Sequence, residues 1–241
     1  AYRFSISWPR VINEESGKIN PLGFDYYKRL IDTLLKADIE PYVTLFHWDM
    51  PQVLENKFGG WAGREIVKRF GAYTEAVVDQ LSDLVTKWFT INEFTCFADA
   101  GYSIGWAPPG KQLPAKERNA IRHNALLAHG TAVQAIRARA KKTAQVGLAE
   151  NSKACTPIIE TPENILASEK AMRIMNSHYI TAVLEGRYTE EYLNAEGAAA
   201  PVFTDEEMKT ISSKLDFIGL NIYTPVYIRA TDSALGYEVV P

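Results

Sequence analysis

The sequence predicts an α/β protein with a parallel sheet, and it favours a (β/α)8 TIM barrel over an open, doubly wound sheet. Short apolar segments alternate five times with amphipathic helical segments, as in parallel sheets covered by helices. Polar side chains recur where these apolar segments end, which in barrels is the rim that carries the active site. None of the apolar segments leads into the glycine-rich turn of a nucleotide-binding sheet.

The expected strands and helices follow one another along the chain. The strands are predicted at residues 2–8, 41–48, 87–94, 144–151 and 215–224. The helices are predicted at residues 20–38, 64–85, 117–140, 168–186 and 204–213, from apolar residues at spacings of three and four. Asn20 and Pro21 suit a helix N-terminus, and Gly186 suits a C-terminal cap. Thr204 and Glu207 form a capping box.

Length and composition indicate one large domain over residues 1–241. An eight-unit barrel takes about 250 residues, and five units already occupy nearly all of this chain. This leaves either an open sheet or an incomplete barrel with about five of eight units, and the polar strand ends favour the barrel. The chain begins without Met on a strand already under way, and residues 225–241 carry no clear pattern.

Charge and hydropathy narrow the class of protein. The net charge of −3, with no basic stripe or tail, argues against a nucleic-acid partner. No apolar run approaches the roughly 20 residues that span a bilayer. No signal peptide is visible either, so we expect no membrane partner and a cytoplasmic location. Cys96 and Cys155 are too few for a disulfide framework and are expected to be reduced core residues.

The residues at the predicted strand ends suit a neutral, hydroxyl-rich ligand. They are Ser7 and Trp8, His47 and Trp48, Asn92 and Glu93, Glu150 and Asn151, and Asn221 and Tyr223. Imidazole, indole, amide and phenol groups bind hydroxyls, whereas a phosphate site would place Arg and Lys on this rim. Trp106, in the loop after the third strand, could flank the same cleft. The other histidines lie within helices without metal-ligand spacing, so we expect no metal and no cofactor.

Glu93 is a carboxyl group at a strand end between two apolar residues, Ile91 and Phe94. An apolar environment disfavours the charged form and raises a carboxyl pKa. A carboxylic acid that stays neutral near pH 7 can act as the general acid in glycoside cleavage. That reaction takes a second carboxyl group, about 5–5.5 Å away in retaining enzymes and about 6.5–9.5 Å away in inverting ones.

Several segments are specific enough in combination to indicate a family. They are "YRFSISWPRV", "PYVTLFHWDMPQ", "GGW", "WFTINEF" and "DFIGLNIYTP". In this order they resemble glycoside hydrolase family 1, the retaining β-glucosidases and their relatives. The resemblance implies a single catalytic (β/α)8-barrel domain over residues 1–241, whose strands two to six are the five strands predicted here. This domain would lack its N-terminal strand and its C-terminal strands.

The resemblance also implies roles for the residues at the rim. Glu93 would be the general acid/base, and Asn92 would bind the 2-hydroxyl of the sugar. His47 and Trp48 would bind hydroxyls of the non-reducing-end sugar. The proline that follows the acid/base in this family is Phe94 here, so the backbone angle that proline would fix is free.

A second set of residues would serve the nucleophile. Tyr223 would hydrogen-bond the nucleophile carboxylate with Arg3 nearby, and Asn221 would line the cleft. The nucleophile itself should lie in an I-T-E-N-G-like stretch, which this sequence lacks, so it is expected beyond residue 241. Glu150 in "LAEN" is a weaker candidate, because the family order makes its strand the fifth; bounding the cleft or holding a loop is the alternative role.

Taken together, the residues and the resemblance predict a β-glucosidase-like retaining hydrolase of bacterial origin. Its substrates would carry terminal non-reducing β-D-glycosyl residues, such as β-glucosides or oligosaccharides like the cellobiose of cellulose degradation. The alternative is a non-catalytic, truncated carbohydrate-binding half-barrel or pseudo-enzyme. The sequence indicates neither the sugar preference nor the oligomeric state.

Overall fold

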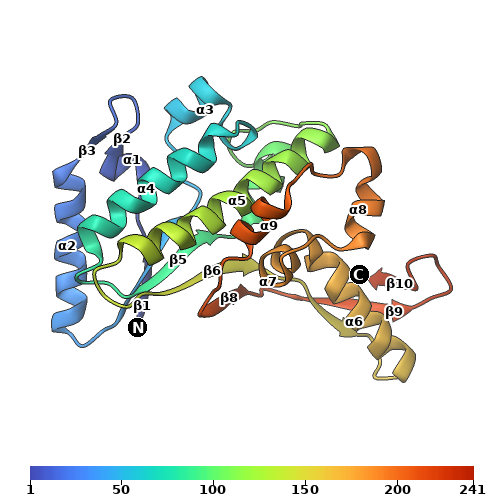
Figure 1. Cartoon of the computed structure of the whole chain (residues 1–241). Helices are drawn as coiled ribbons and strands as arrows, with labels where there is room; N and C mark the ends of the chain where they lie inside the picture. Colours follow the sequence, from blue (N-terminus) through green and yellow to red (C-terminus); the bar gives the residue numbers. More distant parts are fainter.

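The computed structural model describes residues 1–241 and has a five-stranded parallel sheet at its centre (Figure 1). Its strands are β1 (Tyr2–Ser5), β4 (Pro41–Phe46), β5 (Lys87–Asn92), β6 (Gln145–Asn151) and β8 (Phe217–Asn221). Every neighbouring pair is parallel, and the order β1-β4-β5-β6-β8 follows the chain. A doubly wound sheet reverses its order at a switch point. The observed order is instead that of successive barrel units.

Helices connect the strands, and some of them cover one side of the sheet, whereas α6 packs against strands outside it. The elements concerned are α2 (Pro21–Lys36), α4 (Glu65–Leu81), α5 (Ala115–Arg139), α6 (Pro162–Asn176), α7 (Ala182–Glu185), α8 (Glu190–Glu196) and α9 (Asp205–Ile211). Figure 1 shows α4, α5 and α9 above the sheet, with α4 and α5 packed side by side, and α2 standing at the end of the sheet beside β1. The five predicted strands and the helices between them are therefore present.

The predicted helix ends are largely confirmed. Thr204 and Glu207 form the capping box of α9, with hydrogen bonds in both directions. Gly186 follows α7 in the left-handed conformation, with a φ of 68°. Asn20 does precede α2, but its side chain donates to the Arg10 carbonyl (2.8 Å) and does not cap the helix.

The sequence pattern does not predict two regions. Residues after β5 form a π-helix, η2 (Thr95–Ile104), and the helix expected at residues 168–186 is divided by a second one, η3 (Ser177–Thr181). A separate three-stranded sheet joins β7 (Ala154–Pro157), β9 (Pro225–Ala230) and β10 (Tyr237–Val240). A π-turn has no signature in spacings of three and four, and short, half-exposed strands show little alternation.

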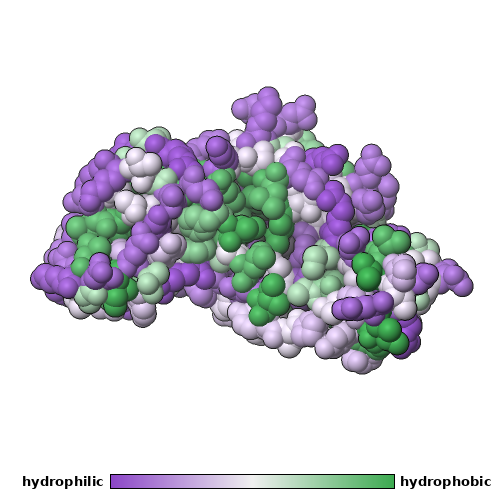
Figure 2. Space-filling model, turned by 90° about the horizontal axis from the view of Figure 1, so that it is seen from below, coloured by the Kyte–Doolittle hydropathy of each residue, from purple (hydrophilic) through white to green (hydrophobic).

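The remaining elements are short and lie in the connections. They are α1 (Trp8–Val11), β2 (Ile12–Asn13), β3 (Lys18–Ile19), α3 (Gln52–Phe58), η1 (Gly60–Ala62) and η4 (Gly197–Ala199). Strand β8 pairs with β6 on one side only. Leu220 and Ile222 are exposed at this edge, and Figure 2 shows hydrophobic surface gathered on the face seen from below.

Strand β8 can approach β6 closely because Gly147 has no side chain. A Cβ atom at Gly147 would overlap the backbone oxygen and the ring of Phe217, its partner in the strand register. The Phe217 ring also packs edge-on against Phe89, with 4.9 Å between ring centroids. This contact sets the spacing at which β8 carries Asn221 to the rim.

We predict that Gly147→Ala lowers the free energy of unfolding by about 1–3 kcal/mol, because overpacking forces the backbone to shift. Gly71→Ala on α4 is the matched control, since its added Cβ would meet only the Thr131 methyl group at 3.0 Å. Helix propensity favours alanine there by about 1 kcal/mol. Denaturant unfolding monitored by circular dichroism measures both changes, and equal stability of the two variants would contradict the packing argument.

Candidate active site

Asn92 ends β5 at the centre of the rim and joins side chains from three other strands or strand ends. Its Oδ1 accepts hydrogen bonds from Arg3 Nη2 (2.7 Å) and Asn221 Nδ2 (3.3 Å). Its Nδ2 lies 3.4 Å from His47 Nε2. These residues meet because the carboxyl ends of parallel strands lie at one edge of the sheet. The structure thus brings together four of the predicted site residues around one buried amide.

Glu93 follows directly, and only 2% of the residue is exposed. Its backbone is left-handed, with a φ of 52°, and its N–H donates to the Ala149 carbonyl of β6 (2.7 Å). Oε1 accepts hydrogen bonds from Asn221 Nδ2 (2.6 Å) and from the Tyr223 hydroxyl (3.0 Å). Oε2 lies 3.3 Å from Cys96 Sγ, which donates to it. Donors therefore approach the carboxyl group at both oxygens.

The apolar surroundings predicted for Glu93 are therefore wrong. Ile91 and Phe94 are buried in the main hydrophobic core, whereas the carboxyl oxygens meet polar groups. A left-handed residue breaks the alternation of a strand, so the neighbours in sequence do not define its surroundings. Tyr223 and Arg3, expected beside a nucleophile, contact Glu93 and Asn92 here. Their role toward a second carboxylate stays a prediction.

His47 and Trp48 lie together after β4, with their rings edge to face and 4.9 Å between centroids. Trp48 is also left-handed, with a φ of 80°, and its indole Nε1 donates to the Asn92 carbonyl (2.8 Å). Burial lowers the pKa of His47, and the positive charge of Arg3 lowers it further, while Glu93 acts in the opposite direction. The imidazole is therefore neutral near pH 7 and can both donate to and accept from a hydroxyl.

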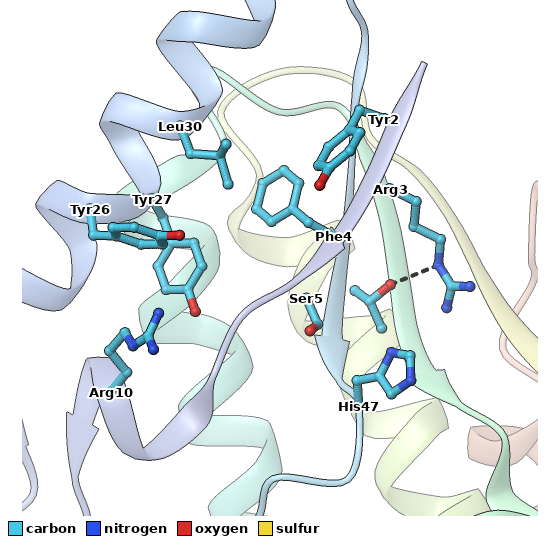
Figure 3. Close-up of a pocket in the computed structure, with 10 residues that line it drawn as sticks. Tyr2, Arg3, Phe4, Ser5, Arg10, Tyr26, Tyr27, Leu30 and His47 are labelled. Atoms are coloured by element: carbon cyan, nitrogen blue, oxygen red, sulfur yellow. Dashed lines mark hydrogen bonds between the residues drawn. The ribbon is translucent and has the colours of Figure 1, made fainter.

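Arg3 and His47 also line one end of a cavity of 460 Å³ between β1 and α2 (Figure 3). Figure 3 shows Tyr26, Tyr27 and Leu30 on the α2 side of this cavity, away from Arg3. Arg3 Nε donates to Thr44 Oγ1 (2.9 Å), the bond drawn in the figure. The cavity therefore flanks the rim along the outer edge of β1 and does not contain Glu93.

Glu150 is the penultimate residue of β6, near Glu93, but it faces a different set of groups. Oε2 accepts the Phe94 N–H (2.7 Å), and Oε1 accepts the Thr95 hydroxyl (2.9 Å). Burial raises the pKa of Glu150 to about 7, and these hydrogen bonds act in the opposite direction. The arrangement matches the alternative role expected for Glu150, which is to hold a loop.

Cys96 is a functional contact that sequence reasoning misses. It was expected in the core, but it is half-buried and lies one helical turn after Glu93, to which it donates. Burial and the hydrogen bond to Glu93 raise the pKa of Cys96 to about 12, so the thiol stays protonated as a donor. The spacing of three residues on a helical turn was the available signal. Cys155 is buried, as predicted.

The other candidates from the strand ends lie outside this cluster. Trp8 is buried against Tyr73, and its Nε1 donates to Glu14 (2.8 Å), so it is a core residue. Trp106 is exposed in the loop after η2. His129 is fully buried and lies 2.6 Å from the Thr90 hydroxyl. No group of three or more His, Cys, Asp or Glu side chains is placed to hold a metal ion. The chain also has no helix with the length and hydropathy of a membrane span.

Comparison with known proteins decides the family of this chain. Residues 1–238 match the family described as glycosyl hydrolase family 1. The chain belongs to this family. It is 39% identical over 237 residues to β-glucosidase A of Acetivibrio thermocellus, covering 97% of this chain and 52% of that protein. It is 36% identical over 242 residues to β-glucosidase 40 of Arabidopsis thaliana, covering 95% of this chain and 48% of that protein.

Solved structures of family 1 show the same fold. The β-glucosidase of Thermotoga maritima in complex with deoxynojirimycin superposes with a TM-score of 0.86 at 35% identity, and covers 100% of this chain and 54% of that chain. The chain thus spans about half the length of its family 1 relatives. The prediction of an incomplete TIM barrel is confirmed.

We predict that Glu150 makes the folded chain less stable as the pH rises from about 4.5 to about 7. Its pKa is raised from 4.5 to about 7 on folding, so the folded state favours the protonated form. That stabilisation is complete below the unfolded pKa and is lost as the pH rises through the folded pKa. Glu150→Gln cannot titrate, so its unfolding free energy should diverge from that of the parent by up to about 3 kcal/mol across this window. Urea unfolding at several pH values tests this, and a difference independent of pH would refute it.

Proposed function

We propose that the polypeptide containing these residues is a retaining β-glucosidase whose general acid/base is Glu93. The observation that carries the proposal is the position of this carboxyl group, which lies at the rim beside the amide of Asn92. Around it stand an imidazole and a phenol, which are neutral groups suited to sugar hydroxyls, and an indole whose N–H is already donated to the Asn92 carbonyl and whose ring offers an apolar face. Family 1 structures hold glucose-like ligands: deoxynojirimycin in the Thermotoga maritima β-glucosidase, and the substrate analog salicin in the virulence factor SghA.

The proposed reaction has two steps. In the first, Glu93 gives its proton to the glycosidic oxygen, the bond from C1 to that oxygen breaks, and a second carboxylate bonds to C1. In the second, Glu93 takes a proton from water, the water oxygen bonds to C1, and the second carboxylate leaves. Oε1 is occupied by Asn221 and Tyr223, whereas Oε2 has only a weak thiol donor. Oε2 is therefore the oxygen best placed to carry the proton.

The second carboxylate is proposed to come from outside residues 1–241. Glu150 does not suit the role, because both of its oxygens accept hydrogen bonds from residues 94 and 95. A retaining reaction needs the second carboxyl group about 5–5.5 Å from the first. Arg3 and Tyr223 are near enough to Asn92 and Glu93 to contact a carboxylate at that distance.

A finer proposal concerns the substrate and the source. Cellobiose, formed during cellulose degradation, is the proposed substrate, since a rim of neutral hydrogen-bonding groups suits an uncharged glucoside. A bacterial source is proposed from the 39% identity to β-glucosidase A of Acetivibrio thermocellus. Turnover of cellobiose compared with that of a β-galactoside would test the substrate.

The alternative is a carbohydrate-binding protein without activity. His47 and Asn221 stand around Asn92, whereas the neighbouring carboxyl group of Glu150 has both oxygens bonded to residues 94 and 95. Hydrolysis of an alkyl β-glucoside by the complete polypeptide, lost in Glu93→Gln, would exclude this alternative. Sugar binding without hydrolysis by the complete polypeptide would favour it.

We predict that Glu93→Gln in the complete polypeptide lowers kcat/KM, which reports the glycosylation step, for alkyl glucosides by about 100-fold or more, the scale of general acid catalysis. Glucosides with an activated aryl leaving group should lose much less in the glycosylation step, because their departure needs little protonation. Steady-state kinetics across a series of leaving groups measures the difference. Glu75→Gln, an exposed position on α4, is the matched control. An equal loss on both substrate classes would contradict the acid role.

We predict that His47→Ala lowers kcat/KM by roughly 10- to 100-fold, the scale of one or two lost hydrogen bonds to a substrate. The loss should be the same for alkyl and activated aryl glucosides, because His47 would contact the sugar and not the leaving group. The same kinetic series measures it. A loss confined to alkyl glucosides would place His47 in proton transfer and not in sugar binding.

A further inference from the structure

The turn that carries Glu93 has to be held by its surroundings. Glu93 is a non-glycine residue in the left-handed region, with a φ of 52°. Such a residue costs conformational energy and persists only where neighbouring contacts fix it. The contacts that follow Glu93 in the chain are therefore those that decide where its carboxyl group points.

Two consecutive residues of β6 make these contacts. The Ala149 carbonyl accepts the Glu93 N–H (2.7 Å). The Glu150 carboxyl group accepts the Phe94 N–H (2.7 Å) and the Thr95 hydroxyl (2.9 Å), with the Thr95 N–H at 3.5 Å. Three successive residues after β5 are thus fastened to the end of β6, and Glu150 makes most of the bonds.

We propose that Glu150 is a positioning residue, which holds the turn at residues 93–95 so that the Glu93 carboxyl group points at the substrate. The proposal rests on the acid/base role proposed for Glu93. It concerns a group that touches neither substrate nor the reacting atoms and that acts through the backbone.

The surroundings leave the turn no substitute for this carboxyl group. Phe94 is fully buried, and its ring stacks on Tyr179 with 5.1 Å between centroids and an interplanar angle of 12°. The stacked ring fixes the direction of the Phe94 N–H, so this donor depends on an acceptor at the Glu150 position. Residues 94 and 95 also begin η2, whose free N–H groups at this end favour a negative charge. An apolar side chain at position 150 would leave these donors unpaired.

The test compares Glu150→Leu, Glu150→Gln and the parent in the complete polypeptide that contains residues 1–241. Glu150→Leu should lower kcat/KM for alkyl glucosides by roughly 10- to 100-fold, since a misplacement of about 1 Å can cost about 100-fold. The kcat/KM for activated aryl glucosides should fall much less, because their departure needs little protonation. Glu150→Gln keeps one acceptor oxygen and should give an intermediate loss.

A second background separates positioning from general damage. With Glu93→Gln already present, Glu150→Leu should add no further dependence on the leaving group, because the proton that it helps to deliver is gone. Val146→Ala, buried at the other end of β6, is the matched control and should leave the dependence on the leaving group unchanged. Equal loss on both substrate classes, or the same loss in both backgrounds, would overturn the proposal.

The failure of this proposal differs from that of the proposed function. If Glu93→Gln itself shows no selective loss on alkyl glucosides, the acid role is wrong. If Glu93→Gln shows it and Glu150→Leu does not, only the positioning role is wrong. Should Glu150→Leu fail to fold, Thr95→Val removes the hydroxyl donor while keeping the shape. It should then reproduce a smaller loss of the same selectivity, and its absence would count against the proposal.

Discussion

The site depends on a departure from regular strand geometry at the end of β5. Successive side chains of a strand point to opposite faces, yet Asn92 and Glu93 both reach the amide group of Asn221, at 3.3 and 2.6 Å. The pairing of β5 with β6 shifts between Phe89 and Asn92, and Glu93 then turns left-handed. The two changes together allow an amide and an acid that are adjacent in sequence to serve one cleft.

A layer of polar groups beneath the rim supports this geometry. Asp99 of η2 accepts hydrogen bonds from Arg122 Nε of α5 (2.8 Å) and from the Tyr179 hydroxyl of η3 (3.2 Å). Tyr179 also stacks on Phe94, so the same residue contacts both the turn and the ion pair. Buried charges are tolerated when they are paired and hydrogen-bonded. The segment after Glu93 is thus tied to two helices as well as to β6.

The sequence predicts what is local or repeated. The five strands, the Thr204 capping box and the left-handed Gly186 follow from periodicity and from single-residue preferences. The convergence of His47 and Asn92 follows from the rule that parallel strands end at one edge. These features follow from the geometry of the chain itself. They can therefore be predicted without knowing which distant residues are in contact.

The contacts that the sequence does not predict are those between distant residues at irregular backbone. The donors around Glu93 come from residues 96, 221 and 223, and no pattern near Glu93 names the last two. The π-helices depart from the 3.6-residue period by which helices are recognised in a sequence. The sequence therefore does not predict which way the side chains after β5 point. The surroundings of a left-handed residue are set by tertiary contacts, and these appear only in the folded chain.

The presence of phenylalanine at position 94 and that of a buried carboxyl group at position 150 are linked by one hydrogen bond. Proline, expected at position 94 from the family resemblance, has no N–H and fixes its own φ, so it needs no acceptor. Phenylalanine brings an N–H into a buried position, where an unpaired donor is costly. Glu150 supplies the acceptor at 2.7 Å, and its own burial raises its pKa to about 7. In this chain the turn after Glu93 is therefore fixed by a hydrogen bond to a buried carboxyl group, and not by the ring of a proline. The support of the acid/base thus comes from the neighbouring strand β6 and not from the residue that follows it in the chain.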